Sequence, residues 1–120
     1  MSGSTWRGPR EVWLALRWSV QGLQAAWRAE ASFRLEIALF AIVFPLALWL
    51  GDGRAEKALL VGVLLPIPAA ELFNSGMEAL VDKLWPERDP VAGRIKDWGG
   101  AAVFLMIVNA ALVWGIVLLR

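Results

Sequence analysis

Long apolar stretches dominate the sequence and predict membrane-spanning helices. Residues 98–119 carry no charge, and at about 1.5 Å per residue they span roughly 33 Å, enough to cross a hydrocarbon core about 30 Å thick. The apolar run 37–50 is shorter, so we extend it back through charged residues that can lie at the membrane interface. Residues 58–70 are also uncharged, and a helical pattern continues beyond them. We predict spanning helices at about 31–50, 57–84 and 97–119.

The first thirty residues show a different pattern, typical of an amphipathic helix lying in the membrane interface. Bulky apolar residues recur at steps of three and four, namely Trp13, Leu16, Val20, Leu23 and Trp27. Arginines and glutamines occupy another side of the helical wheel, namely Arg10, Arg17, Gln21, Gln24 and Arg28. We therefore predict a surface helix at about 8–29.

Two polar segments predict surface loops at opposite faces of the membrane. Residues 51–54 resemble a tight turn, and residues 85–94 form a longer segment punctuated by prolines. Pro66 and Pro68 fall inside the second predicted spanning helix, where each removes a backbone donor. We predict a kink there, just before Glu71.

The basic residues predict how the chain is oriented. Nine of them lie in the N-terminal region or between residues 83 and 96, and three lie on the other side of the membrane if three helices cross it. Because basic residues favour the cytoplasmic side, the surface helix and the 85–97 loop are expected there. Several tryptophans fall near predicted membrane boundaries, where aromatic belts form: Trp6, Trp49, Trp85, Trp98 and Trp114.

Composition narrows the chemistry. The chain has 120 residues, 58% of them hydrophobic, and a mean hydropathy of +0.56, which indicates a single all-α membrane domain over residues 1–120. It has no Cys and no His, which excludes disulfides, thiolate metal sites and imidazole bases. The net charge of +1 does not indicate a nucleic-acid partner.

One face of the second spanning helix concentrates polar residues. At 100° per residue, five positions fall within an arc of roughly 100°: Glu71, Asn74, Ser75, Glu78 and Asp82. Clustered carboxylates repel one another unless a cation neutralises them, and magnesium prefers oxygen ligands, so this face could receive Mg-ATP. Lys96 could then reach phosphate oxygens while Asp97 lies near the N-terminus of the last helix. A solvated helix end and a positively charged membrane anchor remain simpler readings of the same residues.

Longer stretches of sequence resemble the small integral-membrane diacylglycerol kinases of bacteria. The similarity covers nearly the whole chain and is carried by Glu71–Asp82, Gly93–Asp97, Gly99–Val103, Gly22–Trp27 and Glu30–Arg34. The most specific part is the E-x-x-N-S-x-x-E-x-x-V-D run followed by Lys-Asp.

The resemblance implies a homotrimer of three-helix protomers in the bacterial inner membrane, with active sites between protomers at the cytoplasmic interface. It implies transfer of the ATP γ-phosphate to diacylglycerol, producing phosphatidic acid in phospholipid metabolism. Glu71 would be the general base, helped by Asn74, and Glu30 and Glu78 would bind Mg²⁺. The resemblance also implies nucleotide contacts from the two metal-binding glutamates and from Trp18, Ser19, Gly93, Lys96 and Asp97. Lipid contacts would come from Arg10, Glu71 and Gly100.

Some positions depart from the family pattern and leave the lipid contacts open. Glu11 stands where the family carries a basic residue, with Arg10 adjacent, and Gly100 replaces a serine. Gln21 and Gln24 replace a lysine and an arginine. An undecaprenol kinase of the same family is therefore an alternative, although the sequence at residues 25–27 and 99–103 favours diacylglycerol as the acceptor. A small transporter is a further alternative, but it requires four spanning helices.

Overall fold

The computed structural model describes residues 8–120, which fold entirely into helices, turns and short connections. Trp6, one of the expected boundary residues, lies outside this range. The elements are α1 (Pro9–Ala29), α2 (Ala31–Leu50), α3 (Gly53–Gly62), α4 (Pro66–Leu84) and α5 (Pro90–Leu118). Three helical stretches within the described residues are long and apolar enough to cross a membrane: Ala31–Leu50, Gly53–Leu84 and Pro90–Leu118. The chain is thus an all-α, multi-pass membrane protein.

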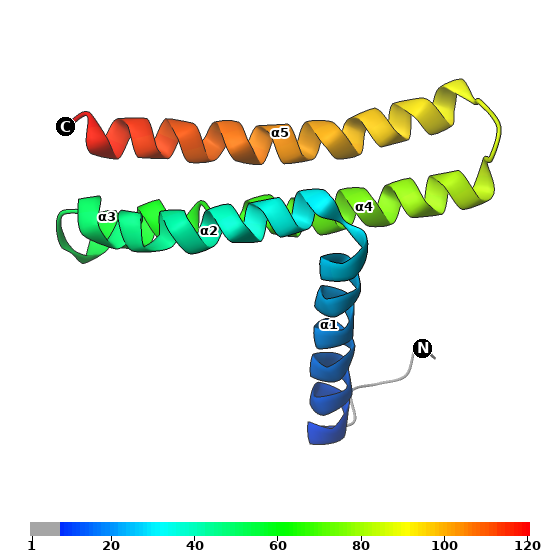
Figure 1. The fold of residues 1–120 in the computed structure, drawn as a ribbon, viewed down its shortest axis with the longest axis horizontal. Helices are drawn as coiled ribbons and strands as arrows, with labels where there is room; N and C mark the ends of the chain where they lie inside the picture. Colours follow the sequence, from blue (N-terminus) through cyan, green and yellow to red (C-terminus); the bar gives the residue numbers. More distant parts are fainter. Residues whose placement is uncertain (1–7) are drawn as a thin grey trace.

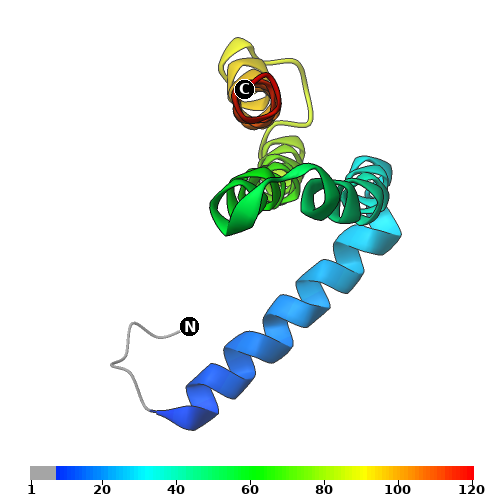
Figure 2. The same ribbon diagram turned by 90° about the vertical axis from the view of Figure 1, so that its left-hand side faces the viewer.

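The three spanning stretches lie side by side, whereas α1 projects crosswise from the start of α2 (Figure 1). Seen along the stretches, α2 and α3 are neighbours and α5 lies over α4 (Figure 2). Glu30 separates α1 from α2 because its extended backbone, with φ −115° and ψ 106°, breaks the helical path. The α5 helix runs the length of the molecule, so the Trp85–Asp89 connection and the C-terminus lie at opposite ends (Figure 1).

Regular helix is interrupted between α3 and α4, at the place where the kink was predicted. Regular α-helix stops at Gly62 and resumes at Pro66, where the prolines cannot donate to the carbonyls four residues earlier. The chain crosses the gap with tighter hydrogen bonds, from Leu64 N to Val61 O at 3.0 Å and from Ile67 N to Leu64 O at 3.2 Å. The stretch predicted as one helix from 57 to 84 is therefore two helices, and it starts at Gly53.

Trp114 on α5 stabilises this break. In an uninterrupted helix, Leu64 N would bond to Leu60 O, but here Leu64 N bonds to Val61 O. The indole Nε1 of Trp114 donates to the freed Leu60 carbonyl at 3.0 Å. Trp114 was expected at a membrane boundary, and the structure gives it a hydrogen bond to a neighbouring helix.

The best-packed part of the protomer lies at the end that holds the C-terminus. Ala47, Leu60 and Val117 are buried together there, with Trp114 and three other apolar residues packed around them. Arg120 closes this end, since its Nη2 lies 3.3 Å from Glu56 Oε1 and its Nη1 donates to Val117 O at 2.7 Å. These contacts hold α2, α3 and α5 together.

The beginning of α5 differs from the prediction. The helix starts at Pro90, not near residue 97, because Pro90 fits the first helical position and Asp89 caps it. The Asp89 Oδ2 accepts a hydrogen bond from Ala92 N at 2.9 Å. The predicted loop over residues 85–94 is consequently limited to Trp85–Asp89. Asp97 lies in the third turn of α5, so its predicted place near the helix N-terminus is wrong.

Large apolar side chains cover much of the protomer surface. Phe73, Trp49 and Ile116 are 81%, 79% and 76% exposed, and no polar or charged residue in the described range is buried. Such a surface suits contact with lipid chains or with other membrane helices, where apolar groups need no shielding from water.

Candidate functional site

The polar face predicted on the second spanning stretch lies on α4. Glu71, Asn74 and Ser75 are half-buried, whereas Glu78 and Asp82 are exposed toward the end of the helix. The Asn74 Nδ2 donates to Glu78 Oε1 at 3.3 Å, one helical turn away. The amide thus contacts the first of the exposed carboxylates of this face.

Lys96 joins this face from α5. Its Nζ lies 2.9 Å from Asp82 Oδ1, and this ion pair connects the two helices across the connection between them. The antiparallel packing of α4 and α5 brings the two residues together although 14 positions separate them in the chain. The amine predicted to meet phosphate oxygens is therefore adjacent to the acidic face.

A second group of acids comes from the junction of α1 and α2. The charges of Glu78 and Glu30 both act on the Glu71 carboxylate, and the charge of Glu71 acts on Glu36. Glu30, Glu71 and Glu78, which the sequence selected, thus share one electrostatic environment within a protomer. A cation there would relieve their mutual repulsion.

Glu36 is a candidate site residue that the sequence analysis did not select. The nearby Arg34 does not pair with it, because Arg34 Nη1 donates to the carbonyls of Trp27 and Arg28, at 2.7 and 3.2 Å. The Glu36 Oε1 atom is buried and has no hydrogen-bond partner among the described residues. The available signal was a carboxylate inside a spanning segment, which usually faces protein or a polar cavity.

Asn74 has a close neighbour on α5. A methyl group added to Gly99 would overlap Asn74 Oδ1, so only glycine leaves room for the amide at this crossing. That oxygen is buried and has no partner among residues 8–120. It therefore retains an unused capacity to accept a hydrogen bond.

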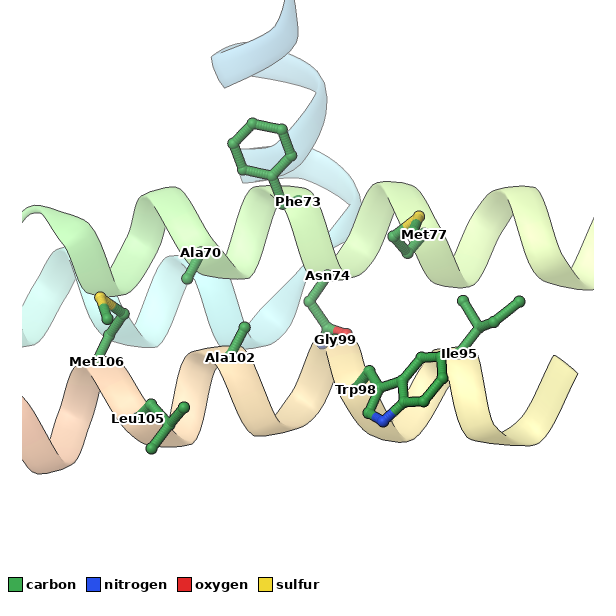
Figure 3. Close-up of a pocket in the computed structure, with 10 residues that line it drawn as sticks. All are labelled: Ala70, Phe73, Asn74, Met77, Ile95, Trp98, Gly99, Ala102, Leu105 and Met106. Carbon is green, nitrogen blue, oxygen red and sulfur yellow. The ribbon is translucent and has the colours of Figure 1, made fainter. Parts of the chain in front are cut away.

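An apolar groove of about 570 Å³ runs between α4 and α5 beside this contact. Figure 3 shows Asn74 pointing from α4 toward Gly99, while Phe73 points away from α5. Apart from Asn74 and Gly99, the groove is lined by apolar side chains: Ala70, Phe73, Met77, Ile95, Trp98, Ala102, Leu105 and Met106. The polar site is thus bordered by a surface suited to lipid or to another apolar helix.

A smaller and more polar cavity of about 220 Å³ lies at the connection between α4 and α5. Gly93 and Lys96, both predicted to contact the nucleotide, line it. Trp85, Arg88 and Asp89 also line it, and the sequence did not select them because a short loop has no periodicity to mark inward positions.

The residues selected on α1 lie apart from this cavity in the protomer. Arg10, Trp18 and Ser19 are exposed on α1, which extends away from α5 (Figure 1). Ser19 Oγ donates to Ala15 O at 2.9 Å, within its own helix. Asp97 and Gly100 are exposed on α5. One protomer therefore brings together Glu71, Asn74, Glu78 and Lys96, but not the α1 residues.

The predicted magnesium site rests on the carboxylates of Glu30 and Glu78 alone. Within residues 8–120, no group of three or more acidic side chains is arranged to hold a metal ion. Glu30 and Glu78 as magnesium ligands therefore stay a prediction.

These features define a helical membrane protein whose spanning helices gather carboxylates, an amide and an amine at one end. The model of the family described as prokaryotic diacylglycerol kinase matches residues 17–118. This chain belongs to that family, and it is an enzyme of that kind.

Relatives from several bacteria support the assignment. A diacylglycerol kinase of Haemophilus influenzae is 39% identical over 99 residues, which cover 82% of this chain and 84% of the relative. A diacylglycerol kinase of Pseudomonas aeruginosa is 36% identical over 99% of both chains. The Escherichia coli K12 diacylglycerol kinase is 36% identical over 104 residues, covering 87% of this chain and 85% of the relative. The similarity thus includes α1, the three candidate spans and the candidate site residues.

Proposed function

We propose that this protein transfers the γ-phosphate of ATP to the hydroxyl of diacylglycerol, producing phosphatidic acid and ADP at the cytoplasmic face of the bacterial inner membrane. The observation that carries the proposal is the ion pair between Asp82, on the acidic face of α4, and Lys96 of α5, in a chain of this family. Phosphoryl transfer depends mainly on alignment and charge neutralisation, which such residues provide.

Glu71 is the proposed general base. The lipid hydroxyl oxygen attacks the γ-phosphorus while its proton passes to Glu71, and the bond to the bridging oxygen of ADP breaks. Glu71 is half-buried on α4, and the adjacent Ala70 lines the apolar groove, so the Glu71 carboxylate can meet a hydroxyl that stays in the membrane interface. Asn74, bonded to Glu78, would keep the neighbouring carboxylate in place.

The nucleotide is proposed to lie over the α4–α5 connection. Lys96 and Gly93 line the polar cavity there, and Lys96 would exchange Asp82 for phosphate oxygens. Asp97, Trp18 and Ser19 would complete the nucleotide contacts. Glu30 and Glu78 would hold Mg²⁺, since their carboxylate oxygens are ligands that magnesium prefers and their charges already act together on Glu71. Magnesium bound there would neutralise phosphate charge.

A homotrimer with active sites between protomers would explain where the α1 residues act. Arg10, Trp18 and Ser19 lie away from Lys96 in one protomer, and α1 extends outward (Figure 1). An α1 helix lying in the cytoplasmic interface could therefore meet the α4–α5 end of a neighbour. Arg10 and Gly100 would then contact the lipid headgroup region.

Substitution of the proposed base tests the function. Purified wild-type protein with Mg-ATP and dioctanoylglycerol is expected to form phosphatidic acid, and Glu71→Gln is expected to lower kcat by about 10² to 10⁴-fold, the usual effect of losing a general base. Glu56→Gln removes an acid at the opposite end of the protomer and should stay near wild-type activity. A Glu71→Gln protein with wild-type kcat would remove Glu71 from this role.

The acceptor panel separates the remaining alternatives. The three relatives described above are named as diacylglycerol kinases, which favours diacylglycerol over undecaprenol as acceptor. A higher kcat/KM for undecaprenol would reverse that choice. A four-helix transporter is disfavoured because the described residues contain three candidate spans.

A further inference from the structure

A crevice separate from the α4–α5 groove lies where the α3–α4 break faces α2. Its volume is about 260 Å³. One wall is a face of α2 formed by Glu36, Leu39, Phe40 and Val43, and the opposite wall includes Leu64 and Pro68. Apart from Glu36, every residue that lines it is apolar.

The proline break shapes one side of this crevice. Leu64 belongs to the turn that replaces regular helix, and buried Pro68 follows in the first turn of α4. Pro66 lacks an N–H and leaves the Gly62 carbonyl without its helical donor. Irregular backbone at membrane depth is tolerated where it is buried in protein or lines a cavity, and interrupted spanning helices commonly mark binding sites.

The crevice has one polar end and an apolar interior. The α2 positions 36, 39, 40 and 43 follow the spacing of one helix face, so the wall extends roughly 10 Å along the axis. Glu36 lies near the start of α2, and its Oε1 is buried without a partner among the described residues. Val43 lies deeper in the same span. The Phe40 ring is held by Phe44, with ring centroids 5.7 Å apart.

The polar end adjoins the proposed reaction centre. Ile67 lines the crevice opposite Glu36, and Glu71 lies one turn later on the same face of α4, so a ligand whose hydroxyl meets Glu36 places that hydroxyl near the proposed base. A hydroxyl can donate to the unpartnered carboxylate oxygen, and a hydrocarbon chain suits the remaining walls. The complementary ligand is an amphiphilic alcohol oriented with its tail toward the middle of the membrane.

We propose that this crevice binds one acyl chain of the diacylglycerol acceptor and that Val43 and the Pro66–Pro68 break set the chain length it accepts. The proposal rests on the proposed lipid kinase activity and adds a specificity site to it. The chain would enter beside Glu36 and end against Val43 and the break.

The test compares kcat/KM for diacylglycerols from short to long acyl chains in mixed micelles. Val43→Trp fills the deep end and is expected to lower kcat/KM for long chains about tenfold or more, since a few methylenes in an apolar pocket have effects of that size. Values for the shortest chains and the KM for ATP should change less than about twofold. Ile42→Trp is the matched control, because Ile42 is 66% exposed and does not line the crevice.

Two further variants keep the test decisive if Val43→Trp does not fold. Val43→Ala deepens the crevice and should shift the preference toward longer chains. Replacing both Pro66 and Pro68 by Leu restores backbone donors and should narrow the chain-length range. An equal change in kcat/KM for every chain length would overturn the inference. A change of oligomeric state without a change in chain-length preference would also overturn it, and would indicate that a helix of another copy occupies the crevice. A wild-type protein inactive on every diacylglycerol would instead overturn the proposed function.

Discussion

At the residue scale, Asn74 contacts both helices of the candidate site, α4 and α5. Its Nδ2 donates to Glu78, while its Oδ1 is buried against Gly99 without a partner among the described residues. Leaving a buried acceptor unsatisfied costs about 1–3 kcal/mol, so this oxygen is expected to accept a hydrogen bond when substrate binds. The glycine opposite is what permits the amide to lie there.

Gly99→Ala tests this contact. The added methyl group would displace the Asn74 side chain, and kcat is expected to fall about tenfold or more because the Glu78 carboxylate loses its positioning partner. Gly115→Ala on the same helix is the control, since a methyl group there meets no atom within 4 Å. Steady-state assays with dioctanoylglycerol measure both. Equal kcat values for the two variants would show that the Asn74 position does not matter.

At the element scale, α3 is tied to its neighbours by apolar packing, a hydrogen bond and an ion pair. The buried cluster around Leu60, the Trp114 hydrogen bond and the Arg120–Glu56 ion pair all act on α3 or its N-terminal end. The acids proposed to act in catalysis lie beyond the proline break on α4. The break thus separates an anchoring segment from a segment that carries chemistry.

Trp114→Phe tests the anchoring of α3. Phenylalanine keeps most of the apolar packing but leaves the Leu60 carbonyl without a donor, so the free energy of unfolding should fall by about 1 kcal/mol, the scale of hydrogen bonds between membrane helices. Reversible unfolding in SDS-containing micelles measures the difference. Trp49→Phe, at a side chain that is 79% exposed, is the control. No difference between the two variants would mean that the indole hydrogen bond adds no stability.

At the scale of the whole molecule, three spans would place α1 and the end of α5 on opposite sides of the membrane. The α1 helix and the Trp85–Asp89 connection are proposed to face the cytoplasm, and Asp52 the opposite side. Because the chain has no Cys, a single introduced cysteine reports its own location without background.

Single-cysteine labelling tests this topology in intact cells. Asp52→Cys is expected to react with a membrane-impermeant maleimide added outside the inner membrane, and Glu87→Cys only after the membrane is opened. The same variants in detergent, where both should react, provide the control. Labelling of Glu87→Cys in intact cells would reverse the orientation.

Mixed oligomers test whether the site is shared between protomers. Glu71→Gln and Ser19→Tyr proteins are each expected to be inactive or nearly so, because one lacks the base and the other obstructs the proposed nucleotide contact. If sites form between protomers, subunits mixed before reassembly should recover part of the wild-type activity. Recovery at no mixing ratio would indicate that each site is complete within one chain.

Sequence reasoning identified most of this arrangement through residues with a regular local pattern. The spans were readable because a helix must satisfy its backbone within itself in a membrane, which requires a long apolar run. Pro66 and Pro68 predicted the break because the loss of a donor is a local property. The start of α5 was misplaced because the cap formed by Asp89 outweighed the polar character of residues 90–96.

The sequence by itself determined the three apolar spans, the proline interruption and the polar face of α4, since helix periodicity and backbone hydrogen bonding depend only on nearby residues. Tertiary structure decided that Lys96 meets Asp82, that Gly99 makes room for Asn74 and that Glu36 faces a crevice at the break. These contacts join residues on different helices, and the register between helices depends on how their side chains pack together. No local pattern in the chain specifies that register.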